Sequence, residues 1–242
     1  MINSIPVVCY SHSSYSDLWD MFFGQMNKYF PDSKVYLFTE SILDYNLGNT
    51  VVPIIYDDNL DYSDRINSCI SSVEEHLFIY SQEDMILYDT PNYDMLEKIK
   101  LFVEKYNVDY IKFLKGGYHN EIVLEDMPIK NLYYIPHKGY RLSYTNQPTL
   151  WKTNTFKEIY KNLVKVSIKD IELSASDFVN TTDIMGMYWF AGEKKRGTAH
   201  WDSELYPFGN MVSKGKWVYS EYPAELSDLF EFEKHVFFEY GC

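Results

Sequence analysis

The chain has 242 residues, of which 46% are hydrophobic and 24% charged, a composition that suits one globular α/β domain. Its 35 acidic and 22 basic residues give a formal net charge of −13, which argues against nucleic acid or an anionic membrane as a partner. Three cysteines without a CxxC pair, no leader peptide and no apolar stretch of membrane-spanning length predict a reduced, cytoplasmic protein.

Apolar runs and helical patterns alternate through the first half of the chain. We expect buried strands at 5–10, 34–39, 50–56, 77–80 and 109–114. Pro53 favours an edge position for the third of these strands, because proline cannot donate a ladder hydrogen bond. Helices are expected at 17–29, 62–76 and 91–106. This alternation is typical of a mostly parallel sheet with helices on both faces.

The second half of the chain is less regular. We expect strands at 132–135, 141–145 and 216–220, and helices at 154–163 and 176–189. No internal repeat, low-complexity tract or linker interrupts the chain, so residues 1–242 are predicted to form a single domain.

Two carboxylates, Glu83 and Asp84, directly follow the strand expected at 77–80. Ligands of such sheets bind beyond the carboxyl ends of the strands, and paired carboxylates can hold Mg²⁺ or Mn²⁺ together with a phosphate. The alternative is an ordinary acidic turn, although the immediate return to an apolar Met-Ile-Leu run favours a metal site. His200 can complete that site from the C-terminal region, or it is a plain surface or core histidine.

A second acidic segment follows the third expected strand. Asp57 or Asp58 can accept hydrogen bonds from a nucleoside, and Arg65, isolated among acids, can bind a phosphate through two donors. A salt-bridged helix N-terminus explains the same pattern equally well. Ser11 and His12 lie in the loop after the first strand, where they can contact a phosphate of the same ligand.

Three later residues have the chemistry of an acceptor site. Gln147 can bond a sugar hydroxyl, and Trp151 can stack on the apolar face of a pyranose. Read alone, their segment favours a strand end with a half-buried tryptophan. Glu172 can take a proton from an attacking hydroxyl, or it is a surface acid before a helix.

Several common enzyme motifs do not occur in the sequence. The GxGxxG, GxxxxGK[ST], HExxH and GxSxG patterns are missing. Their absence argues against a Rossmann dehydrogenase, a P-loop NTPase, a zincin and a serine hydrolase.

The order of these segments resembles that of small GT-A-fold glycosyltransferases of bacteria and large DNA viruses. The resemblance covers most of residues 5–220 and rests on 9–19, on 56–58 with Arg65, on 82–87, on 147–151, on 171–172 and on 215–217. It implies a GT-A-like sandwich with a donor-binding half at about 1–115 and an acceptor-side half at about 116–242. For a viral member, the compartment would be the host cytoplasm.

The resemblance also implies an activity, namely inverting transfer of a sugar from a nucleotide-sugar donor to a glycan or other hydroxyl acceptor. Mn²⁺ or Mg²⁺ would sit at the family's DxD-like position, which reads Glu83-Asp84 here, with Asp84 as the main ligand. Glu172 would be the base, although the aromatic pair expected before it is missing. The alternatives are a non-catalytic sugar-binding domain and a nucleotidyltransferase, which would normally carry a basic, glycine-rich loop where this chain has Ser-His-Ser-Ser.

Overall fold

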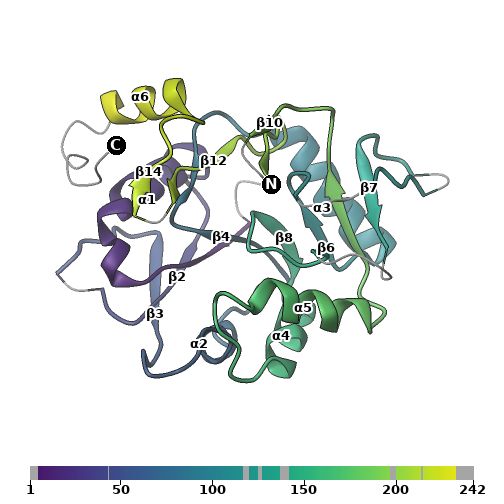
Figure 1. Ribbon diagram of the computed structural model, residues 1–242, viewed down its shortest axis with the longest axis horizontal. Helices are drawn as coiled ribbons and strands as arrows, with labels where there is room; N and C mark the ends of the chain where they lie inside the picture. The colour runs from purple at the N-terminus through teal and green to yellow at the C-terminus, as the bar shows by residue number, and fades with distance from the viewer. Residues whose placement is uncertain are drawn as a thin grey trace.

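The computed structural model describes residues 5–42, 44–116, 120–124, 127–136, 142–196, 200–213 and 215–232. In these ranges an eight-stranded sheet runs through the middle of the molecule (Figure 1). The strand order is β3 (Val51–Ile55), β2 (Val35–Thr39), β1 (Val7–Tyr10), β4 (Leu77–Gln82), β8 (Thr149–Lys152), β6 (Tyr110–Lys112), β9 (Gly186–Trp189) and β7 (Leu132–Ile135). Strands β8 and β7 run against the other six, so the sheet is mostly parallel, as predicted.

Helices cover both faces of this sheet. Residues of β1 alternate between two cores, with Val7 and Cys9 in one and Val8 and Tyr10 in the other, as the two-residue period of a strand requires. The first core includes α1 (Trp19–Tyr29) and α3 (Tyr93–Tyr106). The second includes α2 (Tyr62–Ile70), α4 (Thr153–Asn162) and α5 (Ile171–Asn180). The predicted α/β class with helices on both faces is therefore confirmed.

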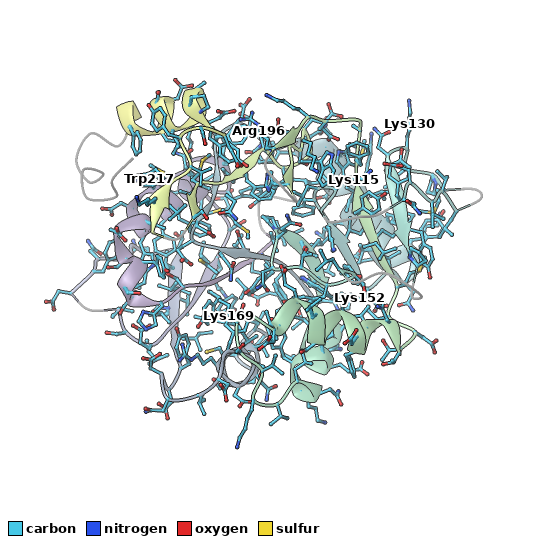
Figure 2. All side chains as sticks on the ribbon, in the orientation of Figure 1. Lys115, Lys130, Lys152, Lys169, Arg196 and Trp217 are labelled. Atoms are coloured by element: carbon cyan, nitrogen blue, oxygen red, sulfur yellow. The ribbon has the colours of Figure 1, made fainter. Side chains whose placement is uncertain are left out.

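The C-terminal part adds three small ribbons and a helix beside α1. Strand β5 (Met85–Leu87) pairs with β12 (Phe208–Asn210), β10 (Lys195–Arg196) with β11 (His200–Trp201), and β13 (Val212–Ser213) with β14 (Lys216–Trp217). Helix α6 (Pro223–Phe232) packs over them in a third apolar core. Arg196 binds Asp202 and Glu225, which fastens α6 to β10; Figure 2 labels Arg196 in this region.

Most expected elements exist with shifted ends. The edge position of β3, which contains Pro53, is confirmed. Helix α2 ends at Ile70, short of the predicted residue 76, and a short 3-10 helix (Ser13–Leu18) precedes α1. Helix α3 begins at Tyr93, after Asn92, whose side chain accepts a hydrogen bond from the amide of Met95 at 3.1 Å.

Two expected elements of the second half are wrong. The described residues 142–145 form turns, and the strand lies further on, as β8. The helix expected at 176–189 is two elements, α5 and then β9. Strand β9 is held close to β6, since a Cβ added at Gly186 would lie 2.1 Å from the ring of Tyr110. This close approach of two strands leaves no room for a helix there.

Candidate functional site

A pocket of about 510 Å³ opens beyond the carboxyl ends of β1 and β4. Its lining comprises Tyr10, His12, Tyr15, Leu60, Asp61, Tyr62, Arg65, Gln82, Glu83, Asp84, Ser167, Ile168, Val212 and Gly215. Four residues predicted from the sequence, His12, Arg65, Glu83 and Asp84, therefore meet in one cavity. Parallel neighbouring strands explain the convergence, because their carboxyl ends share one edge of the sheet.

Glu83 and Asp84 occupy the sharp turn between β4 and β5. The hydroxyl of Ser11 lies near the Glu83 carboxylate and lowers its pKa against the larger effect of burial. The Ser11 oxygen donates to the carbonyl of His12 at 3.3 Å and accepts from the indole of Trp19 at 2.8 Å. With its amide nitrogen turned toward Asp84, Asn210 donates to Oδ2 at 2.9 Å. Oδ1 of Asp84 is buried and has no hydrogen-bond partner among the described residues. The turn therefore presents one carboxylate oxygen whose interactions are unsatisfied.

Burial disfavours the charged form of both acids. It raises the pKa of Asp84 to about 7 and places that of Glu83 well above its ordinary value, with the Asp84 charge as a further cause for Glu83. Two adjacent buried carboxylates of this kind need either a proton or a cation. An oxygen-seeking divalent ion would supply that charge, so the pair fits such an ion.

The predicted third metal ligand does not join this pair. Among the described residues no group of three or more His, Cys, Asp or Glu side chains is placed to hold a metal. His200 instead lies buried with its ring 4.9 Å from that of Phe208 and 6.2 Å from that of Tyr222. Burial lowers the pKa of His200 to about 4, so its ring is neutral at physiological pH. The structure therefore separates His200 from the predicted metal ligands and leaves Glu83 and Asp84 as an adjacent pair of carboxylates.

Arg65 lies in the wall of the pocket and is held there by five contacts. Its guanidinium donates to the carbonyls of Leu60 at 2.7 Å and Asp58 at 2.6 Å, and to the hydroxyl of Tyr10 at 3.3 Å. It also forms an ion pair with the Asp58 carboxylate at 3.0 Å and lies over the ring of Tyr56. Arg65 is therefore ion-paired, as the second interpretation requires, and it also faces the cavity. Its contact with a phosphate stays a prediction.

His12 lies near the carboxylate of Asp58, which also pairs with Arg65. Its Nε2 lies 3.5 Å from Oδ1 of Asp58 and 3.5 Å from Oε1 of Glu40. Asp57, by contrast, is exposed and accepts hydrogen bonds from the backbone and side chain of Asn59 at 2.9 and 2.8 Å. Asp57 closes a turn outside the lining of the pocket.

Two residues of the site were missed from the sequence. Glu40 accepts hydrogen bonds from the backbone amide and hydroxyl of Ser13, which holds the loop that carries His12. It follows the end of β2 directly, so the rule that ligands bind at strand ends could have found it. Asn210 reaches Asp84 from β12, and no local pattern marks it.

The three predicted acceptor residues lie outside the lining of this pocket. Trp151 is 1% exposed and stacks on Tyr110 with ring centres 4.4 Å apart, so its indole is part of the core. Gln147 packs its amide against Gly116, where an added Cβ would lie 2.0 Å away. Glu172 accepts a hydrogen bond from the backbone amide of Asn146 at 2.9 Å. The structure therefore does not bring these three to the carboxylate pair.

A chain of buried tyrosines runs from the pocket into the second core. Tyr62, in the wall of the pocket, shares a 2.7 Å hydrogen bond with Tyr80, and Tyr144 shares one of 2.7 Å with Tyr160. Tyr62 and Tyr160 each influence the pKa of the other hydroxyl, so the two pairs are neighbours. The excess of tyrosine thus serves a buried hydroxyl network, in which each ring packs apolar surface while its polar end stays bonded.

Comparison with known proteins gives distant similarity only. No family model matches the sequence, and no curated protein matches it. Among solved structures, TarS 1-349 of S. aureus has a TM-score of 0.49 and 14% identity, over 77% of this chain and 60% of that one. Its complex with UDP-GlcNAc has a TM-score of 0.49 and 13% identity, over 79% and 60%.

The bifunctional IspDF of Campylobacter jejuni has a TM-score of 0.40 and 11% identity, over 72% of this chain and 47% of that one. The chain thus spans less than two thirds of the length of these proteins. At these identities and TM-scores the likeness assigns no activity to this chain. None of the helices described here is long and apolar enough to cross a membrane.

Proposed function

We propose that this chain is a glycosyltransferase that moves a sugar from a nucleotide-sugar donor to an acceptor hydroxyl. The donor would bind in the pocket beyond β1 and β4 together with a divalent cation, Mn²⁺ or Mg²⁺. One observation carries this proposal: the adjacent buried carboxylates of Glu83 and Asp84 share a cavity with the guanidinium of Arg65. The enzyme class itself is proposed on the resemblance of the ordered sequence segments to GT-A-fold glycosyltransferases.

The charges of the pocket suit a diphosphate that arrives with a metal ion. Asp84, through its unpartnered Oδ1, and Glu83 would hold the ion. When bound, the ion would offset the negative charge that grows on a diphosphate leaving group. Arg65 and His12 line the same cavity and would contact phosphate oxygens. In a protein of net charge −13, Arg65 and the bound ion would supply the local positive charge that an anionic ligand requires.

Aromatic and apolar residues in the same pocket suit a nucleoside. Tyr10 lies 5.5 Å from Tyr56 in a stacked pair, and Leu60 and Ile168 add apolar surface to the lining. The volume of about 510 Å³ is within the usual range for small-ligand sites. Asp58 is the acid placed beside this half of the pocket, through its ion pair with Arg65.

We assign the acceptor side of the site from the resemblance of the sequence to GT-A-fold glycosyltransferases. Glu172, which accepts a hydrogen bond from the backbone amide of Asn146 in this structure, would act as the base of an inverting transfer. The anomeric configuration of the product tests this assignment. A retained configuration would take the role of base away from Glu172.

A binding experiment tests the donor pocket. The protein is titrated with UDP, GDP, ADP and their hexose and N-acetylhexosamine conjugates, with and without Mn²⁺, while thermal unfolding is recorded. A ligand at a hundredfold excess over its dissociation constant raises the free energy of unfolding by about 2.7 kcal/mol. We expect one nucleotide series to stabilise the protein, and only with metal. No stabilisation by any of them would refute the proposal.

A variant pair assigns that stabilisation to the carboxylate turn. Asp84→Asn should lose the metal-dependent shift and the release of nucleoside diphosphate from the donor. Asp32→Asn, at an exposed carboxylate before β2, should keep both. Stabilisation without any turnover, even by hydrolysis, would favour a non-catalytic sugar-binding domain.

A further inference from the structure

A second cavity, of about 500 Å³, lies between α1 and the chain that joins β2 to β3. Figure 1 shows this connection at the left of the sheet, on the side of α1. The lining consists of Asp20, Phe23, Gly24 and Asn27 from α1 and of residues 45–51. It has no residue in common with the lining of the proposed donor pocket. We call it the α1 groove.

Side-chain amides and aromatic rings dominate the α1 groove. Asn27, Asn46 and Asn49 all line it and are exposed. The side chains of Asn27 and Asn49 make no hydrogen bond to any residue that the structure describes, so their donors and acceptors are open to a ligand. Phe23 and Tyr45 present half-buried rings in the same lining. Amides beside aromatic faces suit a ligand with many hydroxyls on an apolar ring.

The charge of the α1 groove narrows the class of ligand. Its described lining contains no Lys or Arg, and its one carboxylate, Asp20, accepts the hydroxyl hydrogen of Tyr45. A phosphate or carboxylate ligand would meet that negative charge on a protein of net charge −13. A purely apolar ligand would cover the side-chain amides of Asn27 and Asn49 without giving them hydrogen-bond partners. An uncharged, hydroxyl-rich molecule meets neither penalty.

A short series of packed residues connects the α1 groove to the proposed donor pocket. The ring of Tyr45 stands edge-on to that of Trp19, with centres 5.2 Å apart and planes at 87°. The indole of Trp19 donates to Ser11 at 2.8 Å, and the Ser11 hydroxyl lies near enough to Glu83 to lower the pKa of that carboxyl. Two residues, Trp19 and Ser11, thus separate the wall of the groove from the carboxylate pair.

We propose that the α1 groove is a binding site for an uncharged saccharide. Its hydroxyls hydrogen-bond the amides of Asn27, Asn46 and Asn49, and a sugar ring packs on Phe23 or Tyr45. The inference rests on the lining of the groove and stands apart from the transferase proposal, since binding here needs neither nucleotide nor metal.

Titration with neutral oligosaccharides tests the inference. Maltohexaose, cellohexaose, xylohexaose and chitohexaose serve as probes, with binding followed by saturation-transfer and amide NMR in the absence of nucleotide. We expect at least one probe to bind and to shift the side-chain amide signals of the groove. The double substitution Asn46→Ala with Asn49→Ala should weaken that binding by about tenfold, because two hydrogen bonds are lost.

Two further variants make the outcome decisive. Asn27→Ala, at an exposed position of α1 where alanine favours the helix, should also weaken binding without disturbing the loop. Asn154→Ala removes an exposed amide from α4, on the other face of the sheet, and should leave binding unchanged.

Failure of this inference is distinguishable from failure of the donor pocket. Binding that persists in the groove variants but is lost in Arg65→Ala would place the saccharide in the donor pocket and overturn the inference. No binding by any of the four probes would overturn it as well. UDP with Mn²⁺, titrated into the same samples, reports on the donor pocket separately.

Discussion

Asp84→Asn should make the ligand-free protein more stable while it abolishes metal-dependent nucleotide binding. Burial raises the pKa of Asp84 from 3.8 to about 7, so ionising this carboxyl costs more in the folded chain than in the unfolded one. At about 1.4 kcal/mol per tenfold change in acidity, the penalty at pH 8 is on the order of 4 kcal/mol. An asparagine carries no such charge. Its carbonyl can still accept from Asn210.

The same shift sets the sign of the pH dependence. Because the folded pKa lies above the unfolded one, the folded state binds the extra proton between pH 3.8 and about 7. The free energy of unfolding of the ligand-free wild type should therefore gain a contribution as the pH falls through this window. Asp84→Asn should lack that contribution and be the more stable protein at pH 8.

Thermal unfolding between pH 5 and pH 8 measures both effects. If half of the penalty is recovered, the Tm of Asp84→Asn at pH 8 should exceed that of the wild type by about 5 °C, since a protein of this size gains 2–4 °C per kcal/mol. Asp32→Asn, at an exposed carboxylate, is the matched control and should follow the wild type. A destabilised Asp84→Asn with an unchanged pH profile would refute the assignment of Asp84 as a strained, buried acid.

Three further substitutions test other parts of the structure. Arg65→Lys should weaken nucleoside diphosphate binding by about tenfold in a titration, because a lysine cannot reproduce the planar contacts to Leu60 and Asp58; unchanged affinity would remove Arg65 from the phosphate site. Trp151→Phe should lower the free energy of unfolding by about 1–2 kcal/mol and leave acceptor KM unchanged, since the indole is buried; a raised KM in a stable variant would restore the predicted acceptor role. Gly186→Ala should cost about 2 kcal/mol or more in chemical denaturation, as its Cβ would strike Tyr110; neutrality would show that β9 can move away from β6.

The positions of the strand-end residues in the first half could be predicted from the sequence. Short apolar runs show where each strand ends, and no knowledge of the tertiary structure is needed for that. Short apolar runs identify β1 and β4, and parallel pairing of these strands brings their ends together. His12 and Glu83 could therefore be assigned to one cavity although 71 residues separate them in the sequence. Arg65 was found by its isolation among acids, and the structure confirms that it lines the cavity.

The strands of the second half were harder to predict because they are short and show no regular alternation of polar and apolar residues. Strand β8 has four residues, all buried, and a fully buried strand shows no alternation of polar and apolar residues. The sequence therefore leaves two interpretations of Trp151 open, a half-buried residue at a strand end and an indole that stacks on a sugar. Its neighbours Tyr110 and Phe156 come from β6 and α4, and only the assembled sheet shows that they enclose it.

The carboxylate turn shows why the site as a whole needs the complete fold. The backbone carbonyl of Asp84 accepts from Met211 at 2.9 Å, the Asp84 carboxylate accepts from Asn210, and β5 pairs with β12 immediately beyond the turn. More than 120 residues of sequence separate these partners, so no local pattern can predict them. The acidic pair therefore takes its geometry from the C-terminal ribbons. Loss of their packing should disorder the pair before it unfolds the parallel sheet, since β4 lies between β1 and β8 without them.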